Sequence, residues 1–323
     1  MRALIVGISG QDGIILSNLL YSKGYKVFGT QIQAEKKTNA GSLSKISKYE
    51  AQVSETDLSI PSTCAEYLDS VKPDVIYHLA AVHGSSSNMN FVENNDSNKM
   101  IKCHVDLTKN LLDWQKINSK ARLCLALTSQ MYSPTAENYE INLNSEFNPQ
   151  NFYAETKLQG FNTLKFYRQK YKLFSVGLIL FNHTSIHAKN DFLFKILARQ
   201  ILDFSEKSQP NIVIRDANQK IDISDAFEVC DAIYRASEYQ FARDFIISSG
   251  KAKSIMEIIL GACHLLNIKI KEGDIISTQP NTNSNCLIGD TYGAEENLNW
   301  RASKDPAEIL ANMIRYEAIS RNE

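Results

Sequence analysis

The first 180 residues alternate regularly between short apolar stretches and segments with the periodicity of an amphipathic helix. Predicted strands cover residues 2–7, 25–29, 51–53, 74–79, 122–128 and 173–180, and predicted helices cover 14–21, 62–71, 96–118 and about 153–171. Strands that alternate with helices favour a parallel sheet, because each crossover helix packs back onto one of its faces. We therefore predict an α/β fold built on a doubly wound parallel sheet.

Beyond residue 185 this alternation weakens. We expect helices near 191–206, 224–238, 254–266 and 305–321, strands near 212–215 and 243–248, and a polar loop over 279–285. These segments predict a smaller C-terminal α/β lobe, over residues 185–323, that is interleaved with late strands of the main sheet. Residues 1–184 would form the larger domain.

The composition is that of an ordinary globular protein, with 323 residues, 43% hydrophobic residues, 22% charged residues and a net charge of −1. This balance favours neither nucleic acid nor a membrane surface as a partner. The apolar run at the N-terminus is too short for a signal peptide or a membrane span. The six cysteines form no C-x-x-C pair and the six histidines show no metal-ligand spacing, so we expect a reducing, cytoplasmic location and no metal site.

Three glycines, Gly7, Gly10 and Gly13, lie between the first predicted strand and the first helix. A glycine turn in this position places backbone N–H groups and a helix N-terminus against a pyrophosphate, which predicts a Rossmann-type, dinucleotide-binding domain. The second strand is followed by Thr30 and Gln31, with neither an acidic residue for a ribose hydroxyl nor an arginine for a 2′-phosphate. The missing arginine favours NAD, with NADP possible.

A second group of chemically useful residues begins at the end of the strand 122–128. Thr128 and Ser129 end that strand, and Tyr153 and Lys157 follow four residues apart, on one face of the next helix. A phenol has a pKa near 10, so it needs a neighbouring cation to transfer protons at neutral pH. These residues predict a site for proton transfer, although a tyrosine and a lysine at this spacing can also be an ordinary surface pair.

Several motifs together resemble the extended short-chain dehydrogenase/reductase family. Within it they are similar to the branch of GDP-mannose 4,6-dehydratases and GDP-4-keto-6-deoxymannose reductases. The matching segments are 3–13 with its Gly-Gln-Asp-Gly core, 57–58, 77–81, 180–183 and 287–290.

The resemblance implies a role for each matching residue. Thr128, Tyr153 and Lys157 would be catalytic: Thr128 would bind the sugar oxygen at C4, Tyr153 would exchange its proton, and Lys157 would bind the nicotinamide ribose. The implied cofactor-binding residues are Gly7, Gly10, Gln11, Asp12, Gly13, Asp57, Leu58, Leu79, Ala80, Ala81, Tyr153 and Lys157. The implied substrate-binding residues are Ser129, Gln130, Asn182 and Arg215. Relatives pair through helices corresponding to 96–118 and 151–171, which implies a homodimer or a higher homo-oligomer.

Three positions depart from the family pattern. Gln130 replaces the glutamate that would abstract the C5 proton in the dehydratases, and an amide cannot titrate. Gln279 replaces an arginine for the nucleotide phosphates, and His104 replaces an asparagine found in many relatives.

We therefore expect NAD(P)-dependent oxidation or reduction at C4 of a nucleotide-activated sugar, without dehydration. The sugar would be a GDP-linked manno-type hexose or heptose. One alternative is a GDP-sugar 4,6-dehydratase or an epimerase. Another, of a different class, is a catalytically silent, cofactor-binding regulator, although the intact Thr128, Tyr153 and Lys157 count against it.

Overall fold

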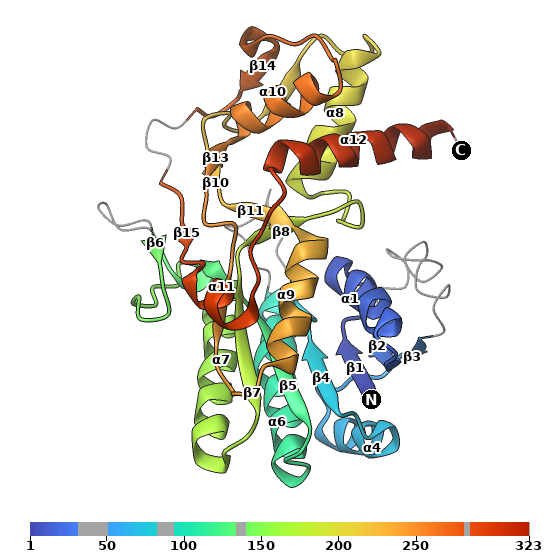
Figure 1. Cartoon of the computed structure of the whole chain (residues 1–323), viewed down its shortest axis with the longest axis vertical. Helices are drawn as coiled ribbons and strands as arrows, with labels where there is room; N and C mark the ends of the chain where they lie inside the picture. The colour runs from blue at the N-terminus through green and yellow to red at the C-terminus, as the bar shows by residue number, and fades with distance from the viewer. Residues whose placement is uncertain (32–50, 83–93, 134–139, 281–284, 323) are drawn as a thin grey trace.

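The computed structural model describes residues 1–31, 51–82, 94–133, 140–280 and 285–322. Within these ranges, seven parallel strands form one sheet in the order β12-β7-β5-β4-β1-β2-β3 (Figure 1). The strands are β1 (Arg2–Val6), β2 (Lys26–Thr30), β3 (Gln52–Ser54), β4 (Val75–His78), β5 (Arg122–Thr128), β7 (Ser175–Leu180) and β12 (Phe245–Ile247). The central strands are almost continuously apolar because both faces of the sheet are covered. The predicted doubly wound α/β fold is confirmed.

Helices cover the two faces of the sheet and build two hydrophobic cores. On one face, α1 (Gln11–Ser22) packs beside α9 (Ala226–Glu238), and Leu16 and Ile233 belong to the same buried cluster as Ile5. On the other face, α4 (Pro61–Val71), α6 (Leu107–Ile117) and α7 (Phe152–Tyr171) enclose a second cluster. The carboxyl ends of the strands between these layers are where such sheets bind ligands.

The long helix predicted over 96–118 is interrupted. It consists of α5 (Asn94–Ile101), a π-helical turn (Lys102–Asp106) and α6. The π-helical turn brings the carbonyl oxygen of His104 close to α7, where a Cβ on Gly160 would lie only 2.4 Å from it. An inserted turn of this kind is common at functional sites, and the apolar periodicity of the sequence did not reveal it.

The C-terminal part of the chain forms a lobe with its own core. Helices α8 (Leu193–Ser205), α10 (Ile255–Leu265) and α12 (Pro306–Asn322) pack together through residues such as Phe194, Leu197, Ile259 and Leu310. Short strand pairs, each strand two or three residues long, occur in this part of the chain and where it meets the main sheet. One of these strands, β9 (Ile212–Ile214), matches the strand predicted over 212–215, and the others were not predicted. The pairs are β8 (Asn182–Thr184) with β11 (Ile223–Asp225), β9 with β14 (Ile275–Ser277), β10 (Lys220–Ile221) with β13 (Lys253–Ser254), and β6 (Glu140–Ile141) with β15 (Ile288–Gly289).

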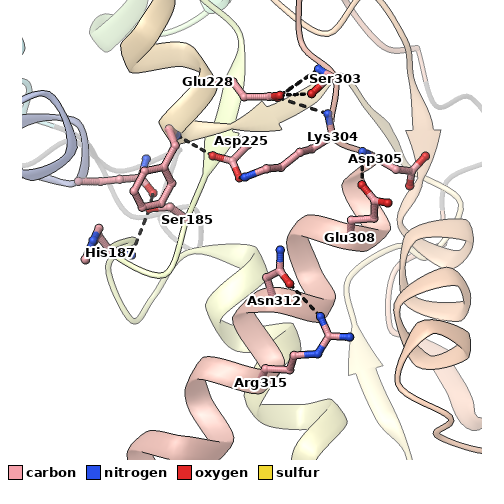
Figure 2. Close-up of polar contacts among 12 residues, drawn as sticks. Ser185, His187, Asp225, Glu228, Ser303, Lys304, Asp305, Glu308, Asn312 and Arg315 are labelled. Atoms are coloured by element: carbon pink, nitrogen blue, oxygen red, sulfur yellow. Dashed lines mark hydrogen bonds and ion pairs between the residues drawn. The ribbon is translucent and has the colours of Figure 1, made fainter. Parts of the chain in front are cut away.

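Three late elements return to the main sheet: α9, β12 and the short helix α11 (Tyr292–Leu298), which was not predicted. The segment that leads from α11 into α12 is bound to α9 by polar contacts (Figure 2). Nζ of Lys304 lies 2.5 Å from Oδ2 of Asp225, and the backbone N–H of Ser303 donates to Glu228 over 3.1 Å. Asp225 also caps α9 by accepting from the backbone N–H of Phe227. These contacts join the lobe to a helix of the main sheet.

In the part of the chain that the structure describes, no helix combines the length and the apolar character that crossing a membrane requires.

Candidate active site

A cavity of about 360 Å³ lies between the carboxyl ends of the central strands and the lobe. Most of the residues predicted from the sequence line it: Gly7, Gly10, Gln11, Asp12, Gly13, Leu79, Ala80, Ala81, Thr128, Ser129, Gln130, Tyr153, Lys157 and Asn182. The structure therefore brings together the glycine turn and the residues around Thr128, which are more than 100 residues apart in the sequence.

Three predicted residues do not line this cavity. Leu58 is buried in a core cluster, and Asp57 accepts from the backbone N–H of Ser59. Arg215 is exposed at the end of β9, where its Nε donates to Oε1 of Gln279 over 3.2 Å. A second hollow of about 630 Å³ in the lobe is lined by residues 204–205, 207–210 and 267–269, and it includes none of the predicted residues.

The glycine turn is close to the strand beside it. Gly7 has a φ of +90°, and a Cβ there would lie 2.8 Å from the Cα of Ala80. A Cβ on Gly13 would lie 2.4 Å from the carbonyl oxygen of Gly7, whereas one on Gly10 would meet nothing nearer than 3.4 Å. Gly10 is the N-cap of α1 and makes no side-chain cap, and a helix N-terminus of this kind binds anions through its first backbone N–H groups. This geometry fits the pyrophosphate of a dinucleotide.

Lys157 is the most deeply buried charged group of the cavity. Its side chain extends from α7 toward β5, where Nζ donates to the carbonyl oxygen of Ala126 over 2.9 Å. Burial lowers the pKa of Lys157 to about 8. Nζ lies 6.0 Å from the centre of the Tyr153 ring, so the ammonium can stabilise a phenolate.

Tyr153 is the second residue of α7 and lies beside Thr128. Burial raises the pKa of the Tyr153 phenol, and a hydrogen bond with the Thr128 side chain acts in the opposite direction. The hydroxyl of Thr128 also accepts from the backbone N–H of Gln130 over 3.2 Å. Because Thr128 ends a buried strand and Tyr153 is in the first turn of α7, both hydroxyls are held by regular structure.

His104 supports Tyr153 from the π-helical turn. The backbone N–H of Val82 donates to its Nε2 over 3.2 Å, so Nδ1 carries the proton and donates to Oγ1 of Thr156 over 2.8 Å. Thr156 in turn donates to the carbonyl oxygen of Tyr153, and the His104 and Tyr153 rings meet edge to face at 5.4 Å. His104 thus links the segment after β4 to the first turn of α7.

Gln130 lies at the rim of the cavity and is exposed. Its Oε1 accepts from Nδ2 of Asn151 over 3.2 Å, and Asn151 caps α7 by accepting from the backbone N–H of Ala154. Among the described residues that line the cavity, Asp12 is the only carboxylate, and its Oδ2 lies 2.9 Å from Nε2 of His183. No unpaired carboxylate is therefore found among these lining residues.

Comparison with known proteins identifies the family. The family model described as GDP-mannose 4,6 dehydratase matches residues 4–313. The chain belongs to this family.

Relatives in the family span nearly the whole chain. GDP-mannose 4,6 dehydratase 2 of Caenorhabditis elegans is 29% identical over 97% of this chain and 87% of its own length. GDP-mannose 4,6 dehydratase of Homo sapiens is 26% identical over 98% and 91%. The chain is thus an enzyme of the extended short-chain dehydrogenase/reductase type that modifies nucleotide sugars, so the alternative of a silent regulator is not supported.

Solved structures share the fold of this GDP-mannose dehydratase family member. The dTDP-glucose 4,6-dehydratase of Bacillus anthracis, in complex with NAD, has a TM-score of 0.84 at 15% identity and covers 100% of this chain and 98% of its own. The UDP-glucose 4-epimerase of Thermotoga maritima also has a TM-score of 0.84, at 16% identity, with 99% and 100% covered. RMD of Pseudomonas aeruginosa, complexed with NADPH, has a TM-score of 0.77 at 18% identity, with 97% of each chain covered.

Some of the residues that line the cavity of this family member were not predicted from the sequence. The lining also includes residues outside the predicted set: Ala126, Leu127, Leu180, Phe181, His183, Thr184, Lys189, Phe192, Leu193, Phe194, Ile221 and Ile223. Most of them are apolar and read as ordinary core positions. Two of them carry chemistry that the sequence could have indicated: His183, within the matching segment 180–183, and Lys189, an exposed cation next to a predicted helix.

Proposed function

We propose that the enzyme oxidises or reduces C4 of a nucleotide-activated sugar with NAD or NADP. The observation that carries this proposal is the grouping of Thr128, Tyr153 and Lys157 beside the glycine turn, in one cavity. When bound, the nicotinamide would accept or supply the hydride. The residues of the chain would bind the sugar, orient it and transfer the proton.

Tyr153 would take the proton from the C4 hydroxyl during oxidation, or return it during reduction. Thr128 would hold the same sugar oxygen through its hydroxyl. Lys157 would lower the cost of forming the tyrosinate, because its buried ammonium lies near the phenol ring. Ser129, Gln130 and Asn182, which line the same cavity, would contact the sugar.

The cofactor would be held by the glycine turn and by residues 79–81, with Asp57 and Leu58 near its adenine. We assign residues 1–184 mainly to cofactor binding and the lobe, 185–323, mainly to the nucleotide sugar. Arg215 would reach the nucleotide part of the substrate from the edge of the lobe. No arginine follows β2 to bind the 2′-phosphate of NADP, which favours NAD over NADP.

Two observations disagree on whether the reaction also removes water from the sugar. The names of the relatives favour a GDP-mannose 4,6-dehydratase over the redox-only reaction predicted from the sequence. The residues favour redox chemistry alone, because Gln130 cannot abstract a proton from C5 and Asp12 is paired with His183. We propose the redox reaction on the strength of Gln130 and keep the dehydratase as the second candidate. An epimerase would also begin with oxidation at C4.

The first experiment incubates the purified enzyme with GDP-mannose or a GDP-manno-heptose, with NAD or NADP, and measures product masses. The proposed reaction gives a sugar that has lost two hydrogens, together with reduced nicotinamide. Loss of water from the sugar would establish the dehydratase instead, and an unchanged mass with a new retention time would indicate an epimer. If none of these forms, the 4-keto sugars are tested with NADH and NADPH.

We expect a homodimer or a higher homo-oligomer in the cytoplasm. The faces of α6 and α7 away from the sheet carry exposed apolar side chains, with Ile117 82% and Phe166 55% exposed. All six cysteines are free thiols, which suits a reducing compartment. Size-exclusion chromatography with light scattering measures the oligomeric state.

A further inference from the structure

Asp12 and His183 form an ion pair across the cavity. Asp12 is in the first turn of α1, and His183 is in β8, which leads into the lobe and pairs there with β11. Nε2 of His183 lies 2.9 Å from Oδ2 of Asp12, and both side chains are largely buried, at 16% and 20% exposed. The pair therefore connects the glycine turn directly to the lobe.

The hydrogen bonds define the charge of His183. Its Nδ1 lies 2.8 Å from the carbonyl oxygen of Phe181, which can only accept, so Nδ1 carries a proton. Its Nε2 faces a carboxylate. Burial lowers the pKa of His183, but the charge of Asp12, the hydrogen bond to Asp12 and the Phe181 carbonyl outweigh it and raise the pKa to about 9. At neutral pH, His183 is an imidazolium.

A second link runs parallel to the ion pair. Oγ of Ser185 donates to Oε1 of Gln11 over 3.0 Å, and Nε2 of Gln11 donates to Oδ1 of Asp12 over 3.1 Å. Ser185 itself accepts from the backbone N–H of His187 over 3.1 Å, as Figure 2 shows. Both carboxylate oxygens of Asp12 are thus occupied by donors, one on α1 and one on the lobe.

The position of Asp12 creates an electrostatic problem. The first turn of α1 is where the pyrophosphate of the proposed cofactor would bind, and a free carboxylate there would repel it. Asp12 also raises the pKa of Tyr153 through its charge. A cation that neutralises Asp12 would remove both penalties.

We propose that His183 is a positioning residue that neutralises Asp12, so that the first turn of α1 can hold an anionic diphosphate, and that the same pair holds this turn against the lobe. This inference rests on the proposed binding of a dinucleotide cofactor. It assigns to His183 an effect on cofactor affinity that acts through Asp12 and needs no contact between His183 and the sugar.

The test measures NAD and NADP affinity of the full chain by isothermal titration calorimetry at pH 7.5. The variants are His183→Gln, Asp12→Asn and the double variant. A glutamine amide can still donate to Asp12, so His183→Gln removes mainly the charge. We expect His183→Gln to weaken cofactor binding about ten- to a hundredfold, the size expected for an unpaired charge close to the diphosphate. Asp12→Asn should bind more tightly than the wild type, because the imidazolium of His183 is then unopposed, and the double variant should recover at least tenfold of the affinity lost in His183→Gln.

Rescue of affinity by the second substitution separates a charge effect from a structural one. Equal weakening in His183→Gln and the double variant would overturn the proposal, as would wild-type affinity in His183→Gln. Should His183→Gln fail to fold in circular dichroism, Asp12→Asn decides: a tenfold loss of affinity in that variant contradicts the proposal. Wild-type enzyme that binds cofactor but converts no nucleotide sugar would defeat the proposed function alone. Wild-type enzyme that binds neither NAD nor NADP would defeat both.

Discussion

Asn151 donates a hydrogen bond to Oε1 of Gln130 across 3.2 Å, and Asn151 also caps α7. The Gln130 side chain, which stands where the dehydratases have a glutamate, is therefore held in place by the start of α7. A glutamate at position 130 could accept the same bond through one carboxylate oxygen. The site could therefore accommodate a glutamate without rearranging the start of α7. A substitution at position 130 can thus test whether this residue alone prevents dehydration of the sugar.

Gln130→Glu should allow loss of water from the sugar after oxidation at C4, because a carboxylate at the rim of the cavity could remove the C5 proton. Mass spectrometry of the product measures this directly. Gln130→Met, of similar length and without a titratable group, is the matched control and should give only the product of the wild type. If Gln130→Glu oxidises the sugar yet never releases water, residue 130 is not what prevents dehydration.

Tyr153→Phe removes the phenol oxygen that exchanges the proton and keeps the ring that packs against His104. Turnover should fall about 10²- to 10⁴-fold, whereas cofactor affinity should change less than about threefold. Steady-state kinetics and calorimetry measure the two quantities. Turnover that survives in this variant would show that another group moves the proton.

Lys157→Met should inactivate the enzyme and stabilise the fold. Burial lowers the pKa of Lys157 from 10.5 to about 8, which corresponds to roughly 3 kcal/mol as an upper limit. In the wild type this cost is present below pH 8 and disappears as the pH rises from 8 to 10.5, because the unfolded chain then binds more protons than the native one. Denaturant unfolding at pH 7 should give a higher free energy of unfolding for Lys157→Met. A less stable variant would mean that the hydrogen bond from Lys157 to Ala126 outweighs the burial of the charge.

The Asp12–His183 pair should make stability fall with pH. The pKa of His183 is raised from 6.5 to about 9, so its contribution is complete below pH 6.5 and is lost as the pH rises through 9. The change amounts to roughly 3 kcal/mol at most. The difference in free energy of unfolding between the wild type and the Asp12→Asn/His183→Gln variant, measured from pH 6 to pH 9.5, should shrink over this window. A constant difference would show that His183 does not titrate there.

Gly160→Ala should destabilise the protein by about 1–3 kcal/mol. The added Cβ would lie 2.4 Å from the backbone oxygen of His104, so α7 and the π-helical turn would have to move apart. Gly293→Ala is the control, since it is also a helical glycine and a Cβ there meets nothing within 4 Å. That substitution should be neutral or stabilising. Thermal unfolding compares the two, and equal melting temperatures would contradict the close contact.

The strands of the main sheet were predicted well because most of them are compact apolar runs; the polar β3 is the exception. The strand predicted over 122–128 coincides with β5, and the others differ from the structure by one or two residues at most ends. The start of α1 was placed three residues late, because Gln11 and Asp12 are polar and interrupt the apolar periodicity. Pairs such as β10 with β13 are too short to carry any periodicity, and the π-helical turn at His104 depends on the contact with Gly160.

The candidate site was predictable where it follows strand ends and glycines. Fourteen of the predicted residues line one cavity, whereas Arg215 faces Gln279 at the edge of the lobe. The pairing of Asp12 with His183 could not be read from the sequence. It joins positions 171 residues apart, and only the return of β8 toward α1 brings them together.

The late return of α9 and β12 to the main sheet has a consequence for how the chain matures. β12 pairs with β7 along Leu178–Leu180, and α9 covers the face on which Val176 and Leu178 are buried. A nascent chain that ended at residue 184 would expose this apolar face and an open strand edge, both of which favour aggregation. The cofactor-binding half therefore cannot complete its fold on the ribosome until residue 247 has emerged, so synthesis of α8 and α9 precedes completion of the sheet.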